Sequence, residues 1–132
     1  MKPYILDTFA LAAYFLGEEP GKKVRNLLKK LKRQKKKAFL CEINLGELYY
    51  ALFRKKGQAK AEEAIDDIYR LPISLISAQW DLILAAAKIK ATKPVSFADA
   101  FVAALAERKK GIIVTSDPEF KFLQNECQIY WL

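Results

Sequence analysis

Hydrophobic and polar positions form two recurring patterns along the chain. Short apolar runs are typical of buried β-strands, and they occur at Tyr4–Leu6, Ala38–Cys41, Ile73–Ile76, Ile112–Val114 and Gln128–Trp131. Between these runs, apolar residues recur every three or four positions, which indicates amphipathic helices. We expect helices over residues 8–16, 21–37, 43–55, 59–69, 78–91 and 96–108, with a short one from Pro118. Alternating strands and helices predict a single α/β domain with a parallel sheet and helices on both faces.

Glycines mark the expected ends of several helices. The segment from Gly17 to Gly21 predicts a break before the second helix, and Gly57 predicts the end of the helix over 43–55. Gly111 is expected to close the helix over 96–108, because glycine readily adopts the left-handed conformation that ends many helices. No linker or repeat divides the chain, so these elements belong to one domain.

The composition restricts the chemistry that the chain can carry out. The chain has 132 residues, 52% hydrophobic and 29% charged, with five Gly and five Pro, as in a globular protein. It contains no histidine, which excludes Ser-His-Asp catalysis, histidine general bases and H-E-x-x-H zinc sites. Cys41 and Cys127 match no metal-binding spacing and are expected to be buried thiols. An enzyme built from this chain must use carboxylates, hydroxyls, lysine or a bound metal.

The net charge of +8 comes from one segment. Residues 21–40 hold ten basic residues and no acid, whereas the rest of the chain has 13 basic and 15 acidic residues. Val24, Leu27, Leu28 and Leu31 form one apolar stripe, which predicts that the lysines face outward from a basic amphipathic helix. Such a segment favours an anionic partner.

No stretch of the chain predicts a signal peptide or a membrane span. Lys2 and Asp7 enclose only four uncharged residues, too few for a signal-peptide core. Uncharged apolar stretches such as Phe9–Leu16 and Ala100–Ala106 are far shorter than the about 18 residues that span a bilayer. We therefore expect a cytoplasmic protein with no membrane partner.

Four carboxylates stand out by position. Asp7 and Asp117 directly follow predicted strands, where parallel sheets bind ligands, although each could equally cap the helix that begins after it. Glu47 and Asp99 lie among apolar residues of their helices, where an unpaired charge would cost several kcal/mol. Asp99 also has an alternative role as the acidic end of a capping box that starts at Ser96. One hypothesis accounts for all four: they surround a divalent cation, and oxygen-only ligands favour Mg²⁺ or Mn²⁺ over zinc.

The segments that contain these acids resemble those of the PIN-domain ribonucleases, and within that family the VapC-type toxins of toxin–antitoxin pairs. The matching segments are Tyr4-Ile-Leu-Asp-Thr8, Leu45-Gly-Glu-Leu48, Ser96-Phe-Ala-Asp-Ala-Phe-Val-Ala-Ala104 and Val114-Thr-Ser-Asp117. They occur in the family's order and cover nearly the whole chain. Each segment alone is weakly specific, but together they are fairly specific.

The resemblance implies a Rossmann-like sheet and Mg²⁺- or Mn²⁺-dependent cleavage of RNA. Asp7 and Asp99 would be direct metal ligands, Glu47 and Asp117 would bind a second ion or orient the attacking water, and Thr115 would support the site through hydrogen bonds. Phe9 departs from the family pattern, which commonly has a small polar residue there. The resemblance also implies a homodimer and a small antitoxin that blocks the site, often with an arginine.

The basic segment has several possible partners. Its lysines and arginines would suit RNA phosphates, and the candidates for such contacts are Lys29, Lys30, Lys32, Arg33, Lys35 and Lys36. The same residues could form a solvated helix face, lie on an anionic membrane or meet an acidic antitoxin segment.

Two other functions remain open from the sequence. One is a non-catalytic PIN-like RNA-binding module in which the acids only cap helices. The other is a phosphoryl-accepting α/β domain with Asp7 or Asp117 as the acceptor, although no second acid precedes Asp7 as such domains normally require.

Overall fold

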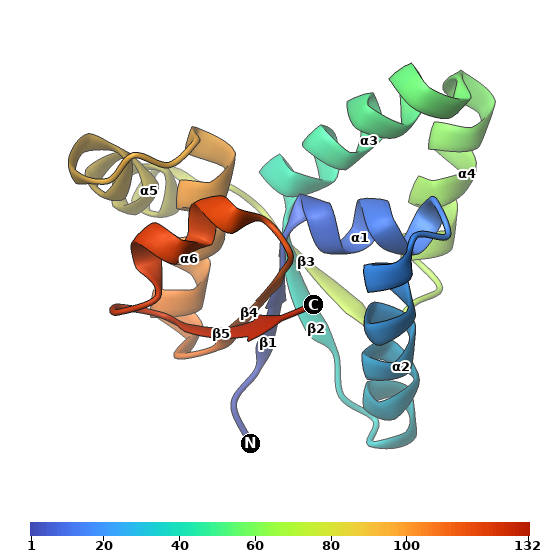
Figure 1. The fold of residues 1–132 in the computed structure, drawn as a ribbon, viewed down its shortest axis with the longest axis horizontal. Helices are drawn as coiled ribbons and strands as arrows, with labels where there is room; N and C mark the ends of the chain where they lie inside the picture. Colours follow the sequence, from blue (N-terminus) through green and yellow to red (C-terminus); the bar gives the residue numbers. More distant parts are fainter.

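A computed structural model describes residues 1–132 and contains one five-stranded sheet in which all strands run parallel (Figure 1). The strands are β1 (Tyr4–Leu6), β2 (Ala38–Cys41), β3 (Ile73–Ile76), β4 (Ile112–Thr115) and β5 (Gln128–Trp131), in the spatial order β3-β2-β1-β4-β5. The helices are α1 (Thr8–Phe15), α2 (Glu19–Arg33), α3 (Glu42–Lys56), α4 (Gln58–Ile68), α5 (Trp80–Thr92), α6 (Phe97–Lys109) and the 3-10 helix η1 (Pro118–Leu123). The predicted α/β class and the parallel sheet are confirmed.

The sheet separates two apolar cores. Helices α1 to α4 bury their apolar residues on one face, with Leu11, Leu28 and Leu48 among them. Helices α5 and α6 and the 3-10 helix cover the other face, where Leu82 and Phe120 are fully buried. Figure 1 shows these two groups of helices on opposite sides of the strands. Because apolar strands are covered on both faces, side chains at the strand ends are the ones left to form a site.

The basic helix differs from the predicted range of 21–37. Helix α2 begins at Glu19, with Pro20 in its first turn, and ends at Arg33. Lys35 has a positive φ of 57° and starts the connection to β2. The shift has a physical reason at each end: proline suits a first helical turn, and the apolar stripe that holds the helix to the core stops at Leu31.

Helix α6 also ends differently from the prediction. The left-handed residue that closes it is Lys110, with φ of 53°, and not Gly111. Gly111 is needed for space instead, because a Cβ there would lie 2.7 Å from the carbonyl oxygen of Pro3. This glycine allows the start of β4 to approach the segment before β1.

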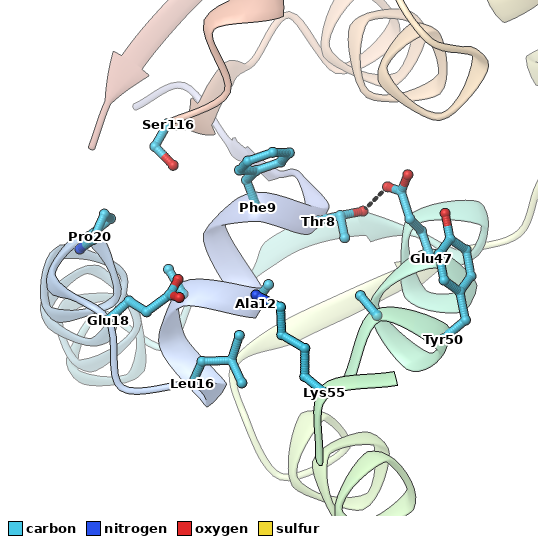
Figure 2. A pocket seen from close by; sticks show the side chains of 12 residues that line it. Thr8, Phe9, Ala12, Leu16, Glu18, Pro20, Glu47, Tyr50, Lys55 and Ser116 are labelled. Carbon is cyan, nitrogen blue, oxygen red and sulfur yellow. Dashed lines mark hydrogen bonds between the residues drawn. The ribbon is translucent and has the colours of Figure 1, made fainter. Parts of the chain in front are cut away.

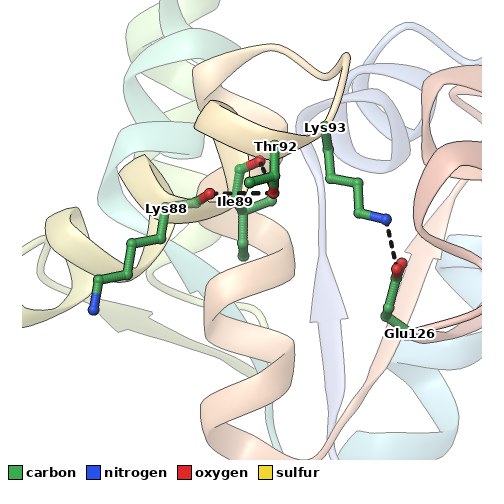
Figure 3. A network of polar contacts seen from close by, with 5 residues as sticks. All are labelled: Lys88, Ile89, Thr92, Lys93 and Glu126. Atoms are coloured by element: carbon green, nitrogen blue, oxygen red, sulfur yellow. Dashed lines mark hydrogen bonds and ion pairs between the residues drawn. The ribbon is translucent and has the colours of Figure 1, made fainter.

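One ion pair joins the segment after α5 to the segment before β5. Lys93 Nζ lies 2.6 Å from Glu126 Oε1, and the Thr92 hydroxyl ends α5 by donating to backbone carbonyls of its own last turn (Figure 3). The pair is half exposed, so it contributes little to stability. None of the helices combines the length and the apolar character needed to cross a membrane.

Candidate metal centre and its acidic residues

Asp7 is held at the carboxyl end of β1 by two hydrogen bonds. Its Oδ1 accepts from the backbone N–H of Ala10 at 2.8 Å, which caps α1, and its Oδ2 accepts from the hydroxyl of Thr115. The Thr115 hydroxyl in turn accepts from the backbone N–H of Asp117 at 2.9 Å. One buried threonine therefore connects the two acids that follow the adjacent strands β1 and β4.

Asp99 and Asp117 form a close group with a third acid, Glu119. One carboxylate oxygen from each lies within 4.8 Å of the others. The side chain of Asp117 caps η1 by accepting from the N–H of Glu119 at 2.9 Å. This group joins the start of α6 to the loop after β4, two segments far apart in the sequence.

The start of α6 explains how Asp99 can face the other acids. The Ser96 hydroxyl accepts from the N–H of Asp99 at 3.1 Å, which is one half of a capping box. The other half would be a bond from the N–H of Ser96 to Asp99, but Glu119 accepts that N–H instead. Glu119 thus leaves the carboxylate of Asp99 available to the acidic group.

Glu47 lies on α3 and stays outside the group of three. Its Oε1 accepts a hydrogen bond from the hydroxyl of Thr8, the residue after Asp7 (Figure 2). Its charge and that of Asp117 both raise the pKa of Asp7, which places all three in one electrostatic neighbourhood. The four acids singled out in the sequence are therefore arranged as one close pair, Asp99 and Asp117, with Asp7 and Glu47 beside them.

Burial makes two of these acids hold protons. Burial raises the pKa of Asp7 to about 7, although the hydrogen bonds from Thr115 and Ala10 oppose the rise. Burial raises the pKa of Asp99 to about 9, and hydrogen bonding to Glu119 and the negative charge of Asp117 raise it further. Buried carboxylates in one neighbourhood resist ionisation unless a positive charge is added.

The protein itself supplies no such positive charge. Five ion pairs are formed, and none of them includes Asp7, Glu47, Asp99 or Asp117. In addition, Asn44 is fully buried between the two sides of the site: its side-chain amide donates to the carbonyl of Ala98, while its Oδ1 has no partner. Oxygen donors, desolvation and an unsatisfied buried acceptor fit a hard divalent cation such as Mg²⁺ or Mn²⁺.

A cavity of about 290 Å³ adjoins Glu47 (Figure 2). Phe9 from α1 and Tyr50 from α3 line it, and these two aromatic side chains are 51% and 48% exposed. Apolar residues of α1 form part of the wall, and Lys55 and Glu18 bring charges to it. The cavity offers flat, apolar surfaces within reach of the acidic residues.

Comparison with known proteins agrees with this architecture. The sequence matches the family model of the PIN domain over residues 4–124. The chain belongs to the PIN-domain family. Comparison with curated proteins gave no significant match to this PIN domain.

Solved structures with the same fold include a VapC toxin and VapBC complexes. The DNA-bound VapBC from Salmonella typhimurium is 17% identical, with 98% of each chain covered and a TM-score of 0.75. VapBC2 from Rickettsia felis, bound to a DNA fragment from its promoter, is also 17% identical, with 96% of each chain covered and a TM-score of 0.74. VapC20 from Mycobacterium tuberculosis, a toxin that cleaves the sarcin-ricin loop, is 21% identical, with 94% of this chain and 95% of that one covered and a TM-score of 0.72. At these identities the likeness shows a shared fold.

Sequence reasoning missed two polar residues of this PIN domain's site. Glu119 follows Asp117 by two positions in the first turn of η1, where an acid is favourable without any ligand, and its contact with Ser96 joins residues 23 positions apart. Asn44 occupies a helical position with no distinctive pattern around it. Only one signal in the sequence could have found Glu119: it is an additional acid close to an acid that was already a candidate.

Proposed function

We propose that this PIN domain is a Mg²⁺- or Mn²⁺-dependent endoribonuclease and the toxin of a toxin–antitoxin pair. The observation that carries the proposal is the convergence of buried acids, with raised pKa values at Asp7 and Asp99 and no basic partner. A purely structural set of helix caps would not require acids to be buried together at one edge of the sheet.

The residues divide into ligands and supports. Asp7 and Asp99 would be the direct ligands, with Glu47, Asp117 and Glu119 available for a second ion or for holding the attacking water. A bound divalent cation acidifies its water and neutralises charge on the phosphoryl group, so no histidine is required. Thr115 fixes the orientation of Asp7 through the hydroxyl that it donates.

The cavity beside Glu47 would hold a nucleotide next to the cleaved bond. Phe9 and Tyr50 expose aromatic faces there, and unpaired bases stack on such faces with little dependence on sequence. The bulky Phe9, which departs from the family pattern, would then have a role in substrate binding.

RNA cleavage by purified protein tests the catalytic proposal. The wild type should cut RNA in Mg²⁺ or Mn²⁺ and not in EDTA, and Asp7→Asn and Asp99→Asn should reduce the rate by at least about a hundredfold. Asp66→Asn, a change at an exposed acid on α4, is the matched control and should cleave normally. RNA binding without cleavage by the wild type would favour the alternative, a non-catalytic RNA-binding module.

The toxin proposal is supported by toxin–antitoxin complexes among the solved structures with this fold. One structure with the same fold is a toxin–antitoxin complex from Klebsiella pneumoniae, 14% identical with a TM-score of 0.69. We therefore expect a small antitoxin as partner and a homodimer of this chain. Expression of the chain alone should arrest growth, the arrest should require Asp7, and co-expression of the adjacent small reading frame should relieve it.

A further inference from the structure

Lysines stand one to three positions before three neighbouring strands. Lys2 precedes β1, Lys36 and Lys37 precede β2, and Lys109 precedes β4. These strands are parallel and adjacent in the order β2-β1-β4, so residues before them lie along the same edge of the sheet, opposite the acids. We call these four residues the amino-edge lysines. In Figure 1, the N-terminus and the end of α2 lie together at this edge.

The amino-edge lysines converge in space as well as in topology. A hollow of about 250 Å³ is lined by Lys2, Lys36 and Lys37 together with Phe39. The ammonium of Lys109 lies 4.5 Å from the centre of the Phe39 ring, so the fourth lysine belongs to the same surface. None of the four forms an ion pair.

The end of α2 enlarges this basic surface. Leu31 lines the hollow, and apart from Gln34 the exposed residues at 29–37 are basic and form no ion pair. They include the six that the sequence suggested for RNA contact: Lys29, Lys30, Lys32, Arg33, Lys35 and Lys36. They belong to the last turn of α2 and its connection to β2, which begins at the amino edge. On its other side the surface ends at Glu107 and Glu126.

These lysines are too far from the acids to act on the phosphate that is cut. Lys2 and Asp7 lie at the two ends of β1, about 17 Å apart for a strand that rises about 3.3 Å per residue. The Debye length at physiological salt is about 8 Å, so exposed charges at this separation are largely screened from each other. Phosphates bound at the amino edge must belong to another part of the polyanion.

We propose that the amino-edge lysines form an RNA exosite, which binds backbone phosphates of a folded RNA while a different part of that RNA is cut at the acidic edge. This inference rests on the proposed function and adds to it a second RNA contact, at the edge of the sheet opposite the acids. Double-stranded RNA is recognised through its shape and its phosphates. A duplex presents phosphates every few ångströms along each strand, so a short helical segment covers the distance between the edges.

Binding to inactive protein tests the exosite without any dependence on cleavage. In an Asp7→Asn background, Lys36→Gln/Lys37→Gln should weaken binding of an RNA hairpin roughly tenfold. The slope of log affinity against log salt concentration should become shallower by an amount that corresponds to up to about two phosphate contacts. The matched control is Lys88→Gln/Lys90→Gln, which removes the same charge from exposed positions of α5 and should leave hairpin affinity unchanged. In the active protein, Lys36→Gln/Lys37→Gln should lower kcat/KM on the hairpin several-fold more than kcat/KM on a short single-stranded oligonucleotide.

Three results would overturn the exosite. The first is unchanged hairpin affinity in Lys36→Gln/Lys37→Gln, and the second is an equal loss of affinity for the hairpin and for a short oligonucleotide. The third comes from binding to vesicles that contain phosphatidylserine: the variant binds these vesicles more weakly than the parent but binds the hairpin equally well. Failure of the proposed function gives a different result, since wild-type protein would then cleave no RNA while the hairpin still distinguished the two double variants.

Discussion

Individual side chains in the acidic site have two roles at once. Asp7 caps α1 and also accepts the hydroxyl of Thr115, and Asp117 caps η1 while it faces Asp99. Helix capping and metal binding are therefore compatible, because a carboxylate has two oxygens and more acceptor capacity than one N–H uses. The caps fix the orientation of each acid before any cation binds.

The raised pKa of Asp7 makes the stability of the metal-free protein depend on pH. Below about pH 4 the carboxyl is protonated in both the folded and the unfolded chain. Between its ordinary value of 3.8 and about 7, only the folded state keeps the proton, so stability falls as the pH rises through this range. We expect a loss on the order of 4 kcal/mol from this residue in the presence of EDTA. Denaturant unfolding at a series of pH values measures it.

Asp7→Asn removes this carboxyl and provides the comparison. The variant should lose less stability between about pH 4 and pH 7, and at about pH 8 it should be more stable than metal-free wild type. Mg²⁺ should raise the melting temperature of wild type more at about pH 8 than at about pH 6, because protons compete with the metal. Parallel pH profiles for wild type and Asp7→Asn would contradict burial as the cause.

Glu119 offers a way to separate support of α6 from metal binding. Glu119→Gln keeps an oxygen that can accept the N–H of Ser96, whereas Glu119→Ala removes it and should cost about 1 kcal/mol of stability. Both variants lose one negative charge from the acidic group, so both should bind Mn²⁺ more weakly. Calorimetric titration with Mn²⁺ and thermal unfolding together distinguish the effects. Equal Mn²⁺ affinity in all three proteins would restrict Glu119 to helix capping.

At the level of helices and strands, the sequence predicted most of the architecture because the apolar patterns are strong and local. All five strands and all the helices were predicted, most with ends within two residues. The exceptions depend on tertiary contacts. Helix α2 ends soon after its last core contact, at Leu31. The close approach of Pro3 requires a glycine at position 111, and α6 is closed by Lys110 instead. No local pattern reports such contacts.

The residues of the acidic site could be predicted from the sequence only where a local pattern marked them. Acids after strands and acids among apolar helix residues identified Asp7, Glu47, Asp99 and Asp117 as candidates, and their roles as ligands remain predictions. The role of Glu119 depends on Ser96, which is 23 positions away, and the sheet order that joins β1 to β4 is not encoded in either strand alone.

The packing of α1 on α2 depends on one glycine. A Cβ at Gly21 would lie 2.4 Å from the carbonyl oxygen of Ala13, which is backbone and cannot move aside. Gly21→Ala should therefore destabilise the protein by about 1–3 kcal/mol. A Cβ at Gly46 in α3 would meet nothing within 4 Å, so Gly46→Ala should stabilise by about 0.5–1 kcal/mol. Opposite shifts in denaturant midpoint check this pair, and shifts of the same sign would contradict it.

Across the whole molecule, charge is divided between the two edges of the sheet. Acids follow β1 and β4 at the carboxyl edge, and lysines precede β1, β2 and β4 at the amino edge. The net charge of +8 therefore includes both a negative carboxyl edge and a positive amino edge. One edge is suited to cations and the other to anions, and the core between them keeps the two apart.

The basic edge should make folding sensitive to salt even without RNA. Unpaired lysines repel one another, and the repulsion weakens as the Debye length falls. Raising KCl from about 0.01 M to about 0.15 M should raise the melting temperature by about 2–4 °C. The rise should be smaller in Lys36→Gln/Lys37→Gln than in Lys88→Gln/Lys90→Gln. If the melting temperatures of the two variants rise equally with salt, repulsion among the amino-edge lysines is not the cause.

The position of β1 at the centre of the sheet also has a consequence for synthesis. Asp7 is made early, but its partner Thr115 at the end of β4 follows it by 108 positions, and Asp117 lies in the loop after that strand. A nascent chain that folds from its N-terminus cannot assemble the acidic site until this segment has left the ribosome. The acid-based cleavage proposed above would therefore require that this later segment has been made and has folded against β1.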